Sequence, residues 1–78
     1  MADVADVLAD LSATVPEHLL PAVATPPQVA KVVQTTVDAL AQDRYRGRGI
    51  PYVRVGRRIR YLRTDVLKYL EGNKIGAA

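Results

Sequence analysis

Hydrophobic residues recur at helical spacing in the first dozen positions of the chain. Within residues 3–12, apolar and acidic side chains fall on opposite faces: Val4, Val7, Leu8 and Leu11 against Asp3, Asp6 and Asp10. A helix of about ten residues is marginal alone, so we expect it to dock on its own domain or on a neighbouring copy. Prolines at positions 16, 21, 26 and 27 predict a semi-rigid connector. We therefore assign residues 1–24 to an extra N-terminal helix and its connector.

Two short helices are predicted next, from about 25 to 33 and from 36 to 45. Thr25 can cap the first helix, Pro26 suits its first position, and Gln28 completes a capping box. A tight turn at 34–35 leads to Thr36, which can cap the second helix. The side chains expected to face inward are Val29, Ala30, Val33, Val37 and Leu40. Two short helices joined in this way form a helix-turn-helix unit.

Alternating residues then predict two strands, at 52–55 and 59–62, joined by a turn at Gly56, Arg57 and Arg58. The alternation places Val53, Val55, Ile59 and Tyr61 on the buried face. A last helix is expected from Arg63 to about Glu71, with a flexible tail at 73–78. The predicted fold is mainly α with a small β-hairpin: a winged helix-turn-helix over residues 25–72 with an extra N-terminal helix.

Charge is distributed very unevenly along the chain. The net charge is +3, yet residues 44–63 hold eight arginines and no acidic residue. A block this basic is suited to a polyanion, and double-stranded DNA is the commonest one. Residues 1–37 carry a net charge of −3 and residues 38–78 a net charge of +6. These opposite charges favour head-to-tail self-association on DNA, and the N-terminal helix is a candidate for that contact.

The predicted elements suggest how DNA would be contacted. The second helix of such a unit usually lies in the major groove, where an exposed Gln can read adenine and Thr hydroxyls can contact bases or phosphates. Arginines at the exit of that helix suit phosphates, and those at the hairpin turn suit the minor groove. The expected DNA-binding residues are Thr35, Thr36, Gln42, Arg44, Tyr45, Arg46, Arg48, Arg54, Arg57, Arg58 and Arg60.

Plainer interpretations of these residues remain open. The exposed helix face and the turn arginines can simply be solvated. Arg54 or Arg60 can instead pair with an acidic residue, the candidates being Asp43, Asp65 and Glu71. Tyrosines can stack on bases, but Tyr52, Tyr61 and Tyr69 are better explained as core residues.

Composition excludes several kinds of chemistry. The chain has no cysteine and one histidine, His18, so we expect no disulfide, no metal site and no cofactor. No nucleophile lies beside a base, and no glycine-rich phosphate loop precedes a helix, so we do not expect an enzyme. No apolar stretch is long enough to span a membrane, and the acidic N-terminus is unlike a signal peptide. We expect a soluble cytoplasmic protein.

Five segments within residues 25–70 match a known pattern: Thr25-Pro26-Pro27-Gln28-Val29-Ala30, Leu40, Arg44-Tyr45-Arg46-Gly47-Arg48-Gly49, Tyr52-Val53-Arg54-Val55-Gly56-Arg57-Arg58-Ile59-Arg60-Tyr61 and Thr64-Asp65-Val66-Leu67-Lys68-Tyr69-Leu70. With these segments the chain resembles the excisionase-type, MerR-like winged-helix domains of phages and actinobacterial mobile elements. The family often has glycine where this chain has Gln34, and usually tryptophan or another aromatic residue where it has Asp43. It often has arginine or an aromatic residue at the position of Ala41. The resemblance implies a nucleoid-associated protein of a bacterial host.

The resemblance implies a recombination directionality factor. Such a protein binds repeated sites cooperatively, bends the DNA and directs a tyrosine- or serine-type integrase toward excision. Related domains serve small transcription regulators, which is the alternative function. A third hypothesis is an adaptor whose arginines contact an acidic protein partner.

Overall fold

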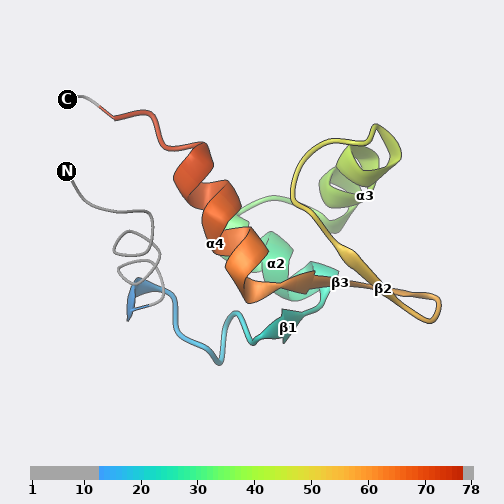
Figure 1. Ribbon diagram of the computed structural model, residues 1–78, viewed down its shortest axis with the longest axis horizontal. Helices are drawn as coiled ribbons and strands as arrows, with labels where there is room; N and C mark the ends of the chain where they lie inside the picture. Colours follow the sequence, from blue (N-terminus) through green and yellow to red (C-terminus); the bar gives the residue numbers. More distant parts are fainter. Residues whose placement is uncertain (1–12, 77–78) are drawn as a thin grey trace.

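The computed structural model describes residues 13–76, and this part of the chain has an α+β fold with three helices and a three-stranded antiparallel sheet (Figure 1). The predicted helix at 3–12 lies outside these residues. The elements are β1 (Val23–Ala24), α2 (Pro26–Val33), α3 (Val37–Tyr45), β2 (Val53–Val55), β3 (Arg58–Leu62) and α4 (Arg63–Gly72). None of the helices in residues 13–76 has the length and apolar composition needed to cross a bilayer.

The predicted start signals of α2 and α3 are confirmed. Thr25 Oγ1 accepts a hydrogen bond from the Gln28 N–H at 3.3 Å, and Gln28 Oε1 accepts one from the Thr25 N–H at 2.9 Å. After α2 the chain turns at Gln34, whose φ is 61°. Thr36 Oγ1 then caps α3 by accepting from the Ala39 N–H at 3.0 Å. Both helices thus begin where side-chain oxygens satisfy their first N–H groups.

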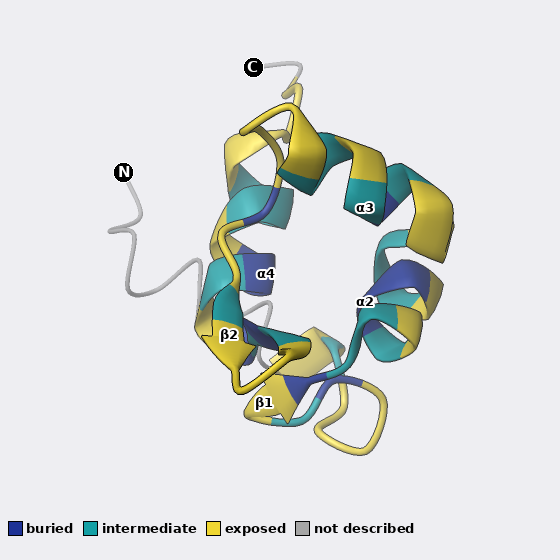
Figure 2. Cartoon of the chain, turned by 90° about the vertical axis from the view of Figure 1, so that its right-hand side faces the viewer, coloured by how far each residue is buried: buried dark blue, intermediate teal, exposed yellow. Residues whose placement is uncertain are grey.

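Burial agrees with the predicted inner faces except at the start of α3. Val29, Ala30 and Leu40 are buried, and Val33 packs partly buried against them. Val37 was expected to face inward but is 42% exposed. It is the first residue of α3, and Leu40 is the only residue of this helix that the core buries. Figure 2 shows the outer surface of α3 and the hairpin turn as mostly exposed.

The sheet contains a strand that the sequence pattern did not predict. Its order is β1-β3-β2, and β1 pairs with β3 through Val23–Leu62 and Ala24–Tyr61. Leu20 and Ala24 have no exposed surface. Leu20, Val23 and Ala24, which were interpreted as part of a connector, therefore belong to the core and the sheet. A two-residue strand among prolines has no detectable periodicity, because only its partner strand defines it.

The β2–β3 hairpin differs from the prediction by one residue of register. The turn contains only Gly56 and Arg57, so Val55 pairs with Arg58 and Val53 with Arg60. A shift of one residue moves side chains to the other face of a sheet. The valines therefore share the outer face with these two arginines, and Val55 is 57% exposed rather than buried. Gly56 has a φ of 62°, which a two-residue turn needs.

Arg63 connects the N-terminal segment to the start of α4. This side chain is only 9% exposed. Its backbone N–H donates to Ala22 O at 3.0 Å, and Nη1 donates to Leu20 O at 2.6 Å. Nη2 donates to Val15 O. One of the eight arginines in the basic stretch is therefore a core residue that holds residues 15–22 in place.

The α4 helix forms where it was predicted, with one difference at its end. Val66 and Leu67 are buried, and Leu70 packs partly buried against the core. The helix includes Gly72 and is capped by Asn73, whereas we expected Gly72 to stop it. Residues 73–76 of the expected tail are exposed.

We predict that Arg63→Met lowers the free energy of unfolding by about 2–4 kcal/mol, because it leaves buried carbonyl groups without their donors. Urea denaturation followed by circular dichroism measures this change. Arg46→Met is the matched control, since Arg46 is exposed, and its effect should stay within about 0.5 kcal/mol. A loss for Arg63→Met no larger than the control's would contradict the anchoring role.

Candidate nucleic-acid interface

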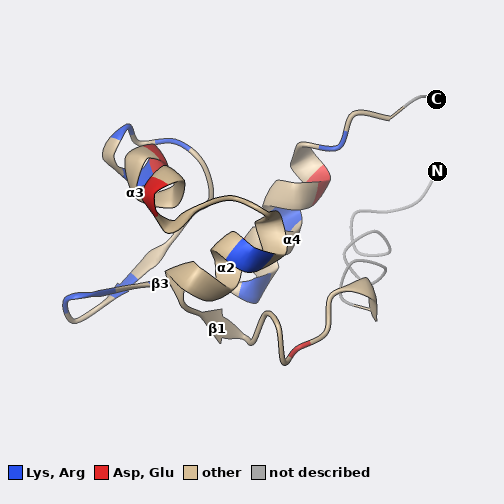
Figure 3. Ribbon diagram, turned by 180° about the vertical axis from the view of Figure 1, so that it is seen from behind, with Lys and Arg blue, Asp and Glu red and all other residues tan. Residues whose placement is uncertain are grey.

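The hairpin and the loop after α3 project from the same end of the molecule, and both carry basic side chains (Figure 3). Among the expected DNA-binding arginines, four are exposed and have side chains that make no hydrogen bond or ion pair within residues 13–76: Arg46, Arg54, Arg57 and Arg58. Because such positive charges repel one another, a bound polyanion would stabilise the part of the fold that carries them. This end of the protein is the candidate interface.

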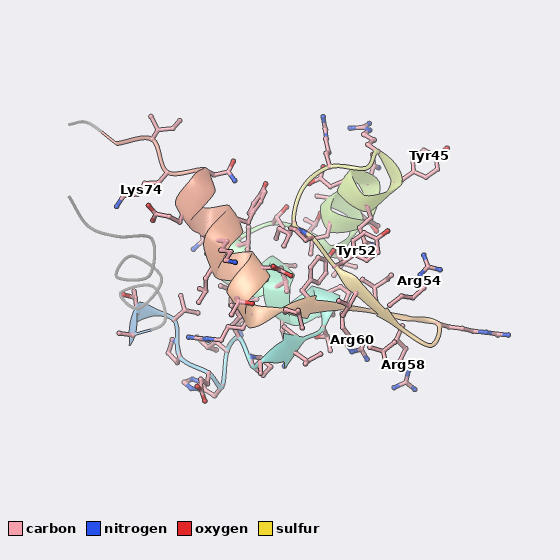
Figure 4. The ribbon with its side chains drawn as sticks, viewed as in Figure 1. Tyr45, Tyr52, Arg54, Arg58, Arg60 and Lys74 are labelled. Carbon is pink, nitrogen blue, oxygen red and sulfur yellow. The ribbon has the colours of Figure 1, made fainter. Side chains whose placement is uncertain are left out.

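The arginines of the hairpin lie on both of its faces. Arg54 pairs across the strands with Ile59, so it shares the inner face with Ile59 and Tyr61. Arg58 and Arg60 lie on the outer face. Figure 4 shows Arg54 on the α3 side of the hairpin and Arg58 and Arg60 on the opposite side. Arg57 occupies the turn between them. Only part of the hairpin charge is therefore directed toward the same side as α3.

Arg60 and Arg54 do not form the ion pairs considered as alternatives. Arg60 Nη1 donates to its neighbour's carbonyl, Ile59 O, at 2.7 Å. Within residues 13–76, neither side chain contacts a carboxylate. Asp43 instead pairs with Arg48, whose Nε lies 3.3 Å from Asp43 Oδ1. Arg48 therefore faces solvent with part of its charge already balanced.

Arg44 is directed into the protein, in contrast to its expected contact with phosphate. Its Nη1 donates to Tyr61 Oη at 2.5 Å. Its guanidinium carbon lies 5.8 Å from the ring centroid of Tyr52 and 5.9 Å from that of Tyr61. The two rings are 6.5 Å apart and tilted by 59°. A hydrogen bond to the buried phenol and cation–π contacts with two rings favour this inward position of the guanidinium over one in solvent.

The tyrosines expected in the core differ in burial. Tyr61 is 1% exposed and Tyr69 is partly buried against the core, as predicted. Tyr52 is 41% exposed, because it precedes β2 and lines an open cavity of about 390 Å³ beside the α3–β2 loop. This cavity is lined by Arg44, Gly47, Arg48, Gly49, Ile50, Pro51 and Tyr52.

The exposed surface of α3 offers few groups that could read bases. Gln42 is exposed, and Tyr45 is 93% exposed at the end of the helix (Figure 4). Thr36 is exposed, but its oxygen already accepts the capping bond. Thr35 is half-buried, and its N–H donates to Ala30 O at 2.9 Å. The structure thus keeps Gln42 and Tyr45 as the most accessible candidates on this helix.

The sequence pattern missed the contacts that shape the α3–β2 loop. Gly49 has a φ of 90°, and a Cβ built on it would lie 2.8 Å from Asp43 Cβ. The Arg48 N–H also donates to Asp43 O at 2.9 Å. Asp43 therefore holds the loop against the end of α3. The sequence shows a glycine at position 49, but it does not show that Asp43 packs against it.

Comparisons of the chain with protein-family models, curated proteins and solved structures find no match. Within residues 13–76, no three His, Asp or Glu side chains lie close enough together to hold a metal ion.

We predict that Gly49→Ala destabilises the protein by about 2 kcal/mol or more, because it combines a strained backbone with a close contact to Asp43. Gly47→Ala is the matched control. Gly47 also has a positive φ, of 68°, but a Cβ there would meet nothing within 4 Å, so we expect a loss of about 1 kcal/mol. Thermal and urea unfolding compare the two. Equal losses would show that the Asp43 contact is unimportant.

Proposed function

We propose that this protein binds double-stranded DNA as a winged helix-turn-helix domain. Helices α2 and α3 are its helix-turn-helix unit, and the β2–β3 hairpin is its wing. The observation that carries the proposal is the set of four exposed arginines at the end formed by α3 and the hairpin, whose side chains have no hydrogen-bond or ion-pair partner within residues 13–76. Attraction to phosphates gives these charges a function, whereas their mutual repulsion only destabilises the fold.

The geometry favours a division of the contacts. Helix α3 would enter the major groove with Gln42 and Tyr45 exposed toward the bases. Arg57, in the protruding turn, would reach the minor groove. Arg54 lies on the α3 side of the hairpin (Figure 4) and would bind a phosphate between the two grooves. Arg46 and Arg48 would bind phosphates beside the exit of α3.

The specific role that fits best is an excision factor. Few groups on α3 can read bases, so most affinity would come from the DNA backbone. One domain of this kind binds a single site modestly, and useful occupancy then needs neighbouring copies. Such a row can stabilise bent DNA. Together with the family resemblance, these properties support the role of a factor that directs an integrase toward excision in the cytoplasm of a bacterial host. A transcription regulator is the alternative, and occupancy of a palindrome by a stable two-fold dimer would favour it.

Self-association can use the outer face of the sheet. This face combines exposed Val23 and Val55 with the basic Arg58 and Arg60. Residues 1–12 are acidic and rich in apolar residues. The basic, apolar outer face and this acidic, apolar segment are complementary in charge, which supports head-to-tail contacts between copies on adjacent sites.

We predict that DNA binding weakens steeply with salt, with a log–log slope between about −3.5 and −5.5, because four to six arginines would contact phosphates. Arg54→Ala with Arg57→Ala should reduce the slope by about 2 and weaken binding at least tenfold. Gel-shift titrations at several salt concentrations, on DNA flanking the encoding gene, measure both quantities.

The matched control is Lys68→Ala with Lys74→Ala, which removes the same charge from α4 and the segment after it, away from the hairpin (Figure 4). This pair should change the slope by much less than the arginine pair. Equal effects of the two double variants would exclude the hairpin as a specific contact. Absence of binding at low salt would exclude DNA and leave an acidic protein as the partner.

We further predict that Val23→Ser with Val55→Ser reduces cooperative binding to two adjacent sites but leaves single-site affinity within about twofold. Leu8→Ser with Leu11→Ser should have the same effect, and combining all four changes should add little, because both pairs would disrupt one contact. Ile75→Ser is the control, since Ile75 is 98% exposed but lies in the C-terminal segment. Unchanged cooperativity in the valine variant would contradict the role of the outer face.

A further inference from the structure

Helix α3 has one side-chain hydrogen bond to the sheet within residues 13–76, and Arg44 makes it. The helix otherwise packs mainly against α2. Arg44 lies in the last turn of α3, and its partner Tyr61 lies near the C-terminal end of β3. The same strand begins at the hairpin turn. This hydrogen bond therefore connects the two elements that carry the candidate interface.

The partner of Arg44 is held rigidly. Tyr61 is 1% exposed, and its backbone pairs with Ala24 of β1. The Tyr52 ring flanks the guanidinium from the segment that precedes β2, at 5.8 Å from the centroid. A planar guanidinium between a phenol oxygen and two rings has little freedom to move. The position of the C-terminal end of α3 relative to the hairpin is thus fixed by side chains from three segments.

We propose that Arg44 is a positioning residue that sets the spacing and angle between α3 and the hairpin, and through them the bend of the bound DNA. The inference rests on the proposed function, because it assigns Arg44 a role in DNA binding without contact to DNA. A helix in the major groove and a wing in the adjacent minor groove must be held at a spacing that matches the duplex. A small misplacement weakens both contacts together.

Two other roles would leave different signatures. An arginine that contacts a phosphate contributes about 0.9 to the salt slope. A purely structural arginine changes thermal stability but not the affinity or bend of the folded protein. A positioning residue changes affinity and bend with nearly the same salt slope, and removing its uncharged partner has the same effect.

The experiment compares Arg44→Met, Tyr61→Phe and the double variant at a temperature where each is fully folded. Tyr61→Phe removes only the hydroxyl that accepts from Arg44 and changes no charge. We expect each single variant to weaken binding about five- to tenfold, to change the bend angle measured by fluorescence energy transfer, and to shift the salt slope by less than about 0.3. The DNA affinity of the double variant should be no more than twofold below that of whichever single variant binds more weakly, because both substitutions break the same hydrogen bond.

Arg54→Met is the matched control, because Arg54 is exposed and without a partner in residues 13–76. It should reduce the slope by about 0.9, and its effect should multiply with that of Tyr61→Phe. If Arg44→Met reduces the salt slope as much as Arg54→Met does, while Tyr61→Phe binds DNA like the wild type, Arg44 contacts phosphate and the inference is wrong. Unchanged affinity and bend in both Arg44→Met and Tyr61→Phe also overturn it. If the wild-type protein binds no DNA at low salt, the proposed function fails, and this inference fails with it.

Discussion

The rest of this small domain depends on the hydrogen bonds that the buried guanidinium of Arg63 donates. It binds the carbonyl groups of Leu20 and Val15, while its backbone N–H binds Ala22. These bonds hold the N-terminal segment against the junction of β3 and α4. Leu20 can then fill the core, and β1 can pair with β3. A positive charge at the start of a helix is unfavourable in itself, so the carbonyl groups are what make this position acceptable.

Eight arginines that look equivalent in the sequence have different roles in the structure. Arg63 is buried, and Arg44 binds a buried phenol. Arg48 is balanced by Asp43, and Arg60 binds a neighbouring carbonyl. The remaining four are exposed without partners within residues 13–76. The charge available to a polyanion is therefore smaller than the sequence suggests, but it is concentrated at one end of the molecule (Figure 3).

This arrangement explains why we favour an architectural role over precise sequence reading. The accessible surface of α3 has one amide, Gln42, and one aromatic side chain, Tyr45, whereas most of the exposed charge lies in the loop and hairpin. Contacts of that kind recognise backbone shape and deformability more than base identity. A rigid spacing between α3 and the hairpin then matters more than any single base contact.

The parts of the fold that could be predicted from the sequence are those set by interactions between residues close together in the chain. The Thr25–Gln28 capping box, the Thr36 cap, the hairpin with its glycine turn and the span of α4 all depend on residues close together in the chain. Only the tertiary structure decided which face of the hairpin Val53 and Val55 occupy, because one residue of turn length reverses the faces. It also decided that β1 is a strand, and that the side chains of Arg44 and Arg63 bond to groups of the fold. Their partners lie 17, 43 and 48 residues away, and a pattern of neighbouring residues contains no information about contacts at that separation.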